Sequence, residues 1–393
     1  MNNHGSFALN LPMKIVALLL ISRYLFSSVF FVLRASPDLP EVSDLTLSDV
    51  PYVSGEPTDR EDSIEVGKLT EASLKPKILF EFAQLLGQKA NHEKSGHTDS
   101  FLVSKAGELL MECYYRRGRI NYPHYQMSIT KSYTSLALGR AIQLGYLKME
   151  DLDKPVHQLI DGLKVADFAK GATAITLHDS LSMCSGIRMP KDRILNAAKK
   201  GSINGRAHAQ ALFSVSDPIN SSSKEYKYQS ADTILVMQVI ESVVPGGAEM
   251  FIREELFGPM DIGFYNWEKD LSGLPKAAAG SSLRSRDMLK VGHLVLNHGE
   301  WMGEQLIPRE YLERATSPLV DTRGNAKYGY FWWSENYEVD GRNYASKQGR
   351  GAGGQFLIIL PEIEVVAVLT AHNQGMGGIL NQTCQALIKT FSN

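Results

Sequence analysis

Runs of hydrophobic residues predict β-strands towards both ends of the chain. Ser100 to Tyr115 contains two strand-like runs on either side of a short turn at Lys105 to Glu108, which predicts an antiparallel hairpin. Gln355 to Ala371 contains two more β-rich runs, interrupted by Pro361 and Glu362. Strands are therefore expected at both ends of one folded domain.

Between these strands, hydrophobic residues recur with helical spacing. A helix is predicted to begin after Ser128 and to end at Gly145, because its apolar residues fall largely on one face. The same spacing predicts helices over Ala231 to Val243 and Arg286 to Gly299. The polar stretches Ala198 to Gln210 and Ser216 to Tyr226 are expected to be connections.

This order of elements predicts an α+β fold. An antiparallel sheet assembled from both ends of the domain would be flanked by helices, with a mainly helical subdomain inserted at about residues 150–285. No internal repeat or low-complexity tract is visible.

The start of the chain has a different pattern. Ile15 to Leu33 is apolar apart from Arg23 and a few hydroxyl residues, and its length is close to a bilayer span of roughly 20 residues. We therefore expect a signal peptide or membrane anchor over residues 1–35, and an exported, periplasmic or membrane-anchored protein; whether the segment is cleaved stays open. Residues 36–68, rich in Pro, Asp, Glu, Ser and Thr, predict a polar linker before a domain at 69–393.

Composition excludes several classes of function. The 393 residues carry a formal net charge of −2 and no basic run, so nucleic acid is not an expected partner. Cys113, Cys184 and Cys384 are too few and too scattered for a disulfide framework or a CxxC metal site. Without HExxH, HxH or GxSxG patterns, neither a metal, a cofactor nor an α/β-hydrolase is expected, and His124 and His372 are interpreted as ordinary polar positions.

A serine and a lysine three residues apart provide the first candidate chemistry. In MSITKS, Ser128 and Lys131 share one face at the start of the predicted helix. A lysine can take the proton of a serine only where burial and nearby positive charge lower its pKa, and the helix N-terminus favours a developing oxyanion. A serine helix cap followed by a surface lysine explains the same residues, so the pattern by itself leaves both interpretations open.

A tyrosine and a serine before the next predicted helix form a second candidate. In YKYQSADT, Tyr228 and Ser230 are two residues apart, and a tyrosine hydroxyl near a lysine can relay the proton of a nucleophile to a leaving group. The alternative is that the Tyr228 ring packs and Ser230 caps a helix beginning at Ala231.

The third candidate is the glycine-rich stretch from Gly349 to Glu362. It matches GxGxxG, but a dinucleotide fingerprint follows a strand and opens a helix, whereas these glycines precede a strand, so we reject that interpretation. Glycines here let a substrate approach the backbone and leave an N–H free to donate to an oxyanion.

Together these segments resemble the serine β-lactamase-like family, which includes class C β-lactamases, penicillin-binding proteins with D-alanyl-D-alanine carboxypeptidase activity, related esterases and the 6-aminohexanoate-dimer hydrolases. The resemblance extends from about Thr70 to the C-terminus. Besides SITK, it rests on four segments in order: Thr176 to Ile187, Glu255 to Pro275, Ser285 to Pro308 and Tyr328 to Trp333.

The resemblance implies an activity and a set of site residues. The protein would be a serine hydrolase that cleaves an amide or ester bond of a small molecule through an acyl-enzyme on Ser128, with Lys131 as base partner and Tyr228 as proton relay. The backbone N–H groups of Ser128 and Ala352 would form the oxyanion hole. The resemblance implies no oligomeric state, and it adds three residues that would contact the substrate: Ser230, Arg350 and Gly351.

Two departures from the family pattern bear on the substrate. The second motif often ends in Asn and here ends in Ser230, and the third usually begins with Lys or His and here begins with Gly349. In the family that cation helps to hold the carboxylate of penicillins or of D-Ala-D-Ala. Arg350 or Lys347 could replace it, although strand alternation turns Arg350 to the other face. We therefore expect an esterase or amidase; the alternatives are a β-lactamase or D,D-carboxypeptidase, and a non-catalytic binding protein.

Overall fold

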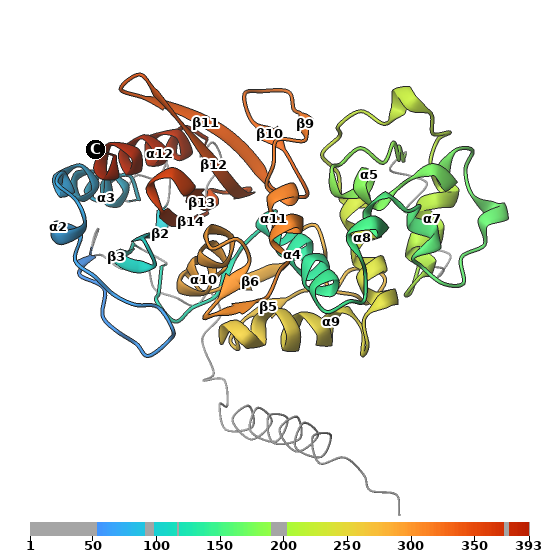
Figure 1. Cartoon of the computed structure of the whole chain (residues 1–393), viewed down its shortest axis with the longest axis horizontal. Coiled ribbons are helices and arrows are strands. Elements are labelled where there is room, and N and C mark those ends of the chain that lie inside the picture. Colours follow the sequence, from blue (N-terminus) through green and yellow to red (C-terminus); the bar gives the residue numbers. More distant parts are fainter. Residues whose placement is uncertain (1–52, 91–97, 116–117, 190–202, 373–376, 393) are drawn as a thin grey trace, which may run out of the picture. The chain divides into compact units, whose positions relative to one another are not determined.

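The computed structural model contains a nine-stranded sheet in which every strand is antiparallel to its neighbours (Figure 1). The strand order is β1-β3-β2-β14-β13-β12-β11-β10-β9. The strands are β1 (Val53–Gly55), β2 (Thr98–Lys105), β3 (Glu108–Tyr114), β9 (Val320–Asp321), β10 (Lys327–Tyr328), β11 (Trp333–Val339), β12 (Arg342–Gly351), β13 (Gln355–Leu360) and β14 (Val365–Ala371). The structure describes residues 53–90, 98–115, 118–189, 203–372 and 377–392.

The predicted fold class and both predicted hairpins are confirmed. β2 pairs with β3, and β13 pairs with β14 after the short helical turn Pro361–Ile363, so Pro361 ends a strand as expected. β14 also pairs with β2, which joins the two ends of the domain in one sheet. The local sequence does not show which distant strands pair with each other. The strand-like runs at both ends of the domain nevertheless predicted that the two ends share one sheet.

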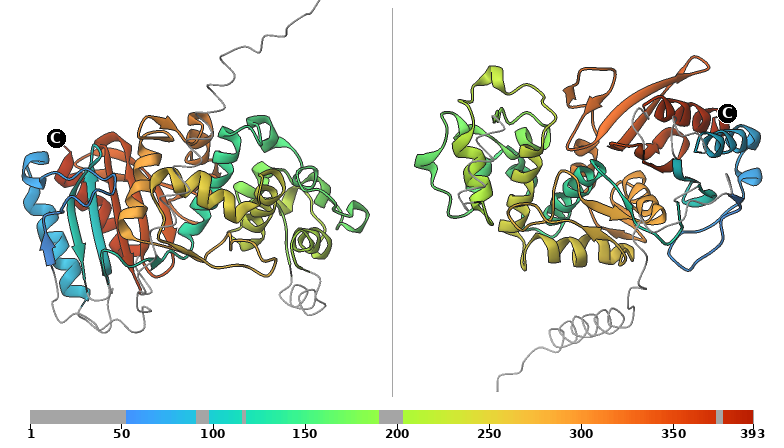
Figure 2. Two further views of the ribbon diagram at one scale, coloured as in Figure 1. Left: turned by 90° about the horizontal axis from the view of Figure 1, so that it is seen from below. Right: turned by 180° about the vertical axis from the view of Figure 1, so that it is seen from behind.

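Helices cover both faces of the sheet, which explains why its central strands are continuously hydrophobic. The helices α3 (Pro76–Ala90) and α12 (Gly377–Phe391) pack on one face, and α4 (Ile129–Gln143) and α10 (Ser285–Leu296) on the other (Figures 1 and 2). In β13, Ile358 belongs to the core under α12, and its neighbours Leu357 and Ile359 belong to the core under α4 and α10. Strands buried on both faces lose the polar alternation of a one-sided sheet.

The helices predicted around the candidate motifs are present. The helix after Ser128 is α4, the one over Ala231 to Val243 is α8 (Ser230–Val243), and the one over Arg286 to Gly299 is α10, which ends three residues early at Leu296. The prediction of a connection over Ala198 to Gln210 was wrong for its last four residues, because helix α7 begins at Ala207. Within the described residues the other α-helices are α2 (Leu69–Ala72), α5 (Leu177–Leu181), α9 (Ala248–Phe251) and α11 (Arg309–Ala315), and α7 spans Ala207–Val215.

The region of the predicted helical insertion, residues 150–285, also contains two short strands, which belong to a second sheet. The short strands β5 (Asn266–Trp267) and β6 (Ser281–Leu283) pair with each other, and β6 pairs with β4 (His124–Tyr125), which precedes the candidate serine. A third, two-stranded sheet pairs β7 (Glu300–Trp301) with β8 (Glu304–Gln305).

The predicted linker is packed into the domain along residues 53–68. β1 pairs with β3, the Ile64 side chain is 3% exposed, and Asp62 accepts hydrogen bonds from the buried Arg286 of α10. The partners of this segment lie far away in the chain, in β3 and α10. The segment itself has little hydrophobic periodicity, so its sequence gave no sign of these contacts.

The predicted membrane segment, Ile15 to Leu33, lies outside the described residues. Within the residues that the structure describes, no single helix has the length and hydrophobicity of a membrane span. One bent pair, Ser230–Val243 with Ala248–Met260, passes by length and composition alone, with 89° between its two parts. Export or anchoring stays a prediction.

Candidate active site

Ser128 stands at the start of α4 with its side chain turned away from the helix backbone. Its hydroxyl makes no capping hydrogen bond and instead accepts one from Nζ of Lys131, at 3.0 Å. Met127, directly before it, has a φ of +50°, a conformation that non-glycine residues adopt rarely and at a cost of roughly 1–3 kcal/mol. This geometry excludes the helix-cap alternative for Ser128.

Neighbouring segments hold the strained turn in place. The backbone N–H of Gln126 donates to the carbonyl oxygen of Ser281 at 2.8 Å, and the hydroxyl of Thr130 donates to the carbonyl oxygen of Met127 at 2.7 Å. The Thr130 hydroxyl also lies 2.8 Å from the Ser281 hydroxyl. The approach to Ser128 is therefore tied to β6 on one side and to the first turn of α4 on the other.

Lys131 is buried rather than on the surface. Only 4% of the residue is exposed, and its Nζ donates to the carbonyl oxygen of Ala278 at 2.6 Å as well as to Ser128. Burial penalises the ammonium form and lowers the pKa of Lys131 to about 8. A substantial fraction of Lys131 is therefore neutral, and able to accept a proton, slightly above neutral pH.

Tyr228 approaches Lys131 from the second motif. Nζ of Lys131 lies 4.6 Å from the centre of the Tyr228 ring, and the ring also packs against Tyr328 and Trp333, with centroid distances of 6.0 and 5.7 Å. Burial raises the pKa of Tyr228 to about 12, against a hydrogen bond with Ser128 that lowers it. The hydroxyl is therefore protonated at neutral pH and hydrogen-bonds with Ser128, while the ring lies next to the amine of Lys131.

Most of α4 is buried, including its polar residues Ser132 and Thr134. The hydroxyl of Ser132 donates to the carbonyl oxygen of Phe331 at 2.8 Å, and that of Thr134 to the carbonyl oxygen of Ala277 at 3.1 Å. Buried hydroxyls that find such partners anchor the helix in addition to its apolar residues. The nucleophile therefore stands on a rigid element.

The glycines of the third motif bring the end of β12 against the approach to the nucleophile. A Cβ atom added to Gly351 would lie 2.4 Å from the carbonyl oxygen of Gln126, and one added to Gly349 would lie 3.2 Å from Cγ2 of Ile129. Only a residue without a side chain allows this contact at Gly351. Ala352 follows at once, exposed in the turn between β12 and β13.

Arg350 lies on the other face of β12, as strand alternation predicted. Its Nη2 forms an ion pair with Glu335, its Nε donates to Oε1 of Gln348 at 2.6 Å, and its guanidinium carbon is 5.1 Å from the centre of the Trp333 ring. Because Trp333 packs against Tyr228, Arg350 is one ring away from the site. Its charge is already paired.

Two other candidates are not joined to this cluster. Lys347 lines a separate cavity of about 600 Å³ with Glu313 and Lys327. Ser230 is exposed and is the first residue of α8, whose N-cap is Gln229, so the alternative that Ser230 caps this helix does not hold, and its contact with a substrate stays a prediction. Among the described residues, no hydrogen bond joins Ser230 to Ser128 or Lys131.

Two contributors to the site were not expected from the sequence. The carbonyl of Ala278 binds Lys131, and the ring of Tyr328 supports Tyr228 together with that of Trp333. A backbone carbonyl has no side-chain signature, so only the fold could reveal Ala278. The YGYFWW segment was noted for its resemblance, but nothing in the sequence indicated which of its rings would face Tyr228.

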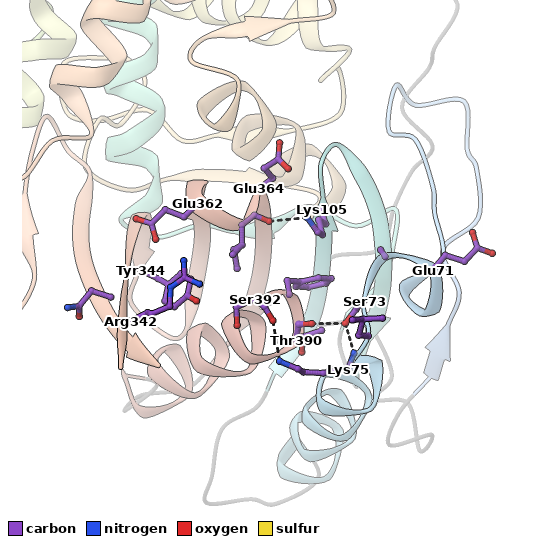
Figure 3. Close-up of a pocket in the computed structure, with 15 residues that line it drawn as sticks. Glu71, Ser73, Lys75, Lys105, Arg342, Tyr344, Glu362, Glu364, Thr390 and Ser392 are labelled. Carbon is purple, nitrogen blue, oxygen red and sulfur yellow. Dashed lines mark hydrogen bonds between the residues drawn. The ribbon is translucent and has the colours of Figure 1, made fainter. Parts of the chain in front are cut away.

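Other parts of the structure supply no comparable chemistry. A cavity of about 690 Å³ lies where the start of α3 meets the end of α12, and the side chains of Ser73 and Lys75 that line it donate to the backbone carbonyl oxygens of Thr390 and Ser392 (Figure 3). None of Ser128, Lys131 and Tyr228 lines it. Among the described residues, no group of three or more His, Cys, Asp or Glu side chains could hold a metal ion.

An antiparallel sheet with helices on both faces, beside a serine, lysine and tyrosine brought together from two motifs, defines a β-lactamase/transpeptidase-like protein. The chain belongs to the beta-lactamase family, whose model matches residues 97–381. The resemblance proposed from the sequence is thereby confirmed.

The relatives named include 6-aminohexanoate-dimer hydrolases and a further hydrolase. The chain is 23% identical over 317 residues to the 6-aminohexanoate-dimer hydrolase of Paenarthrobacter ureafaciens, covering 74% of this chain and 79% of that protein. A solved structure named as a putative 6-aminohexanoate-dimer hydrolase from Bacillus anthracis matches with a TM-score of 0.61 at 20% identity, over 86% of this chain and 90% of the other. The structure of EstCE1, a hydrolase with promiscuous acyltransferase activity, matches with a TM-score of 0.61 at 14% identity, over 81% and 99% of the two chains. These structural matches show the shared fold.

Proposed function

We propose that the protein is a serine hydrolase that cleaves an amide or ester bond of a small molecule through an acyl-enzyme on Ser128. The observation that carries the proposal is the contact of 3.0 Å between the Ser128 hydroxyl and a lysine amine that is 4% exposed. A serine becomes a strong nucleophile only when a nearby base takes its proton, and burial is what makes Lys131 such a base.

The proposed reaction has two steps. In acylation, neutral Lys131 takes the proton from Ser128 as the serine oxygen attacks the carbonyl carbon, and the backbone N–H groups of Ser128 and Ala352 stabilise the oxyanion. Tyr228 passes a proton to the leaving group as its bond to the carbonyl carbon breaks, and takes a proton back from Lys131, whose amine is then neutral again. Water then attacks the ester on Ser128 and gives up a proton to Lys131, which returns it to the Ser128 oxygen as the acid product leaves.

The third motif bears on the substrate class. Gly349 stands where the family usually has a cation, Arg350 is paired with Glu335, and Lys347 lines a separate cavity. This favours an amide or ester whose recognition does not depend on a carboxylate at that position. Gly351 and Ala352 would contact the reacting carbonyl, and Arg350 would act on the substrate only through Trp333.

The alternatives predict different activities. A β-lactamase or D,D-carboxypeptidase would hydrolyse nitrocefin or release D-Ala. A non-catalytic binding protein has no chemical need for a buried Lys131 against Ser128, so the site geometry disfavours it.

The apolar segment from Ile15 to Leu33 supports the further proposal that the enzyme is exported or membrane-anchored.

Intact-mass labelling of the purified full-length chain with a fluorophosphonate probe tests the proposal. We expect one adduct on the wild type, none on Ser128→Ala, and an unchanged adduct on the control Ser222→Ala, a serine that is exposed and whose hydroxyl donates to Asn220 outside the site. A folded wild type without an adduct, or an adduct retained by Ser128→Ala, would contradict the proposal. A positive result leads to a screen of esters, short amides and nitrocefin.

A further inference from the structure

The two histidines that the sequence left without a role meet on one buried carboxylate. Nε2 of His124 and Nδ1 of His372 each lie 2.8 Å from the same oxygen, Oδ2 of Asp99. The Asp99 side chain is fully buried, whereas the two histidine side chains are 22% and 26% exposed. We call these three residues the Asp99 clamp.

A β-bulge directs Asp99 out of the regular sheet. Thr370 and Ala371 of β14 pair with Ser100 and Thr98 of β2, so Asp99 is the extra residue between two ladder positions. Bulges of this kind re-aim a side chain and recur next to active sites. The backbone is packed closely here, because a Cβ on Gly118 would lie 1.6 Å from the carbonyl oxygen of Asp99.

The clamp depends on the charge of Asp99. Burial alone would raise the pKa of Asp99, but hydrogen bonds from His124 and His372 lower it below its ordinary value. An ionised carboxylate can only accept hydrogen bonds, so both histidine ring nitrogens must be donors. Within the described residues Oδ1 of Asp99 has no hydrogen-bond partner, so the buried charge is stabilised chiefly through the two histidines.

One arm of the clamp leads directly to the nucleophile. His124 belongs to β4, and the chain runs from it through Gln126 and the strained Met127 to Ser128. The amide of Gln126 also donates back to the carbonyl oxygen of His124 at 2.8 Å. Holding His124 therefore holds the segment that sets the direction of the Ser128 backbone N–H.

The other arm leads to the glycine turn of the third motif. His372 follows Ala371, whose carbonyl oxygen accepts a hydrogen bond from the side-chain amide of Gln355, and whose N–H donates to the same side chain at 3.3 Å. Gln355 is the first residue of β13, directly after the turn that contains Ala352. The second arm therefore supports the other donor of the proposed oxyanion hole.

We propose that Asp99, with His124 and His372, is a positioning residue that keeps the two oxyanion-hole donors, the backbone N–H groups of Ser128 and Ala352, at their working separation. The inference rests on the proposed function. Oxyanion donors act only at the right distance and direction, so small displacements reduce the reaction rate more than binding.

Saturation kinetics of fluorophosphonate labelling on the full-length chain separate these effects. Attack of the Ser128 oxygen on phosphorus expels fluoride and places the phosphoryl oxygen where the carbonyl oxygen of a substrate would lie. For Asp99→Asn, His124→Gln and His372→Gln we expect the limiting rate constant to fall about tenfold or more, and half-saturation to stay within about threefold. Because the three residues act together, Asp99→Asn combined with His124→Gln should be no slower than the slower single variant.

Glu112→Gln is the matched control. Glu112 is also a buried carboxylate on the neighbouring strand β3, but it binds Arg286 at 2.8 and 2.7 Å. It should lower thermal stability without changing the labelling rate of folded protein. If Asp99→Asn fails to fold, the labelling rates of His124→Gln and His372→Gln test the proposal, because these two side chains are partly exposed.

Labelling of the variants at the wild-type rate, or a loss matched by Glu112→Gln, overturns the clamp while leaving the proposed function intact. Absence of any Ser128 adduct on the wild type contradicts the proposed function and the clamp with it.

Discussion

The protonation of Lys131 is the property of the site on which the proposed reaction depends most directly. A lysine in water keeps its proton to a pH above 10, and could not deprotonate a serine at neutral pH. Burial of Lys131 lowers its pKa to about 8. The hydrogen bonds that its amine donates to the Ser128 hydroxyl and to the carbonyl oxygen of Ala278 hold the amine in one place. Lys131 therefore combines availability as a base with a fixed geometry.

The rate of labelling or hydrolysis should rise with pH as Lys131 loses its proton. Below pH 8 the ammonium form has no lone pair to accept the serine proton, so we expect an acid limb with a midpoint near 8. Tyr228, with a pKa of about 12, keeps its proton through this range, so the rate should stay level from about pH 9 until Tyr228 ionises. The measurement is the fluorophosphonate labelling rate from pH 6 to 10.

Lys131→Met links that limb to one residue. It removes the amine at similar length and should lower the rate by about 10²–10⁴-fold and abolish the limb near pH 8. Lys347→Met is the control, because Lys347 is another partly buried lysine whose pKa burial lowers, but it lines a separate cavity. An acid limb that persists in Lys131→Met would assign the base to another group.

The end of β12, which carries the third motif, packs directly against the residues that precede Ser128. The contact between Gly351 and the carbonyl of Gln126 is backbone against backbone, so neither partner can move aside by a rotamer change. The glycine-rich sequence therefore has a packing cause here as well as the chemical one expected from the sequence.

Gly351→Ala should separate β12 from the approach to Ser128. The added Cβ would lie 2.4 Å from the oxygen of Gln126, and we expect a loss of about 1–3 kcal/mol in the free energy of unfolding together with an at least tenfold slower labelling of Ser128. Gly324→Ala is the control, because nothing lies within 4 Å of a Cβ added there. Chemical denaturation and labelling kinetics measure the two effects, and equal behaviour of the two variants would refute the packing argument.

The whole domain is stabilised by residues that the sequence pattern assigned to a linker. Arg286 is 3% exposed and is surrounded by Glu112, Asp62 and the carbonyl oxygen of Thr58. Two of these three partners precede Leu69. A buried guanidinium that loses acceptors is costly, because its N–H groups cannot return to water.

A chain that starts at Leu69 should therefore be less stable than one that starts at Thr46. It loses the pairing of β1 with β3 and the bonds from Arg286 to Asp62 and Thr58, and we expect a decrease of about 1–3 kcal/mol, visible as a lower Tm. Asp62→Asn in the longer chain should reproduce part of the loss. Identical melting curves for the two chains would show that residues 53–68 contribute nothing to stability.

Local patterns predicted the hairpins, the helix after Ser128 and the order of the three motifs, because strand and helix periodicity and turn residues act over a few neighbouring positions. The resemblance then identified Ser128, Lys131 and Tyr228, and the structure brings them together. The same local patterns misjudged residues 53–68, because the partners of these residues lie far away in the chain.

The amino-acid pattern alone determined the class of fold and the candidates for the chemistry. Only the tertiary structure decided that Ser128 binds Lys131 instead of capping a helix, that Arg350 is paired with Glu335, and that His124 and His372 share Asp99. The physical reason is the same in each case: burial, pKa and hydrogen-bond partners are properties of segments that meet only after the chain has folded.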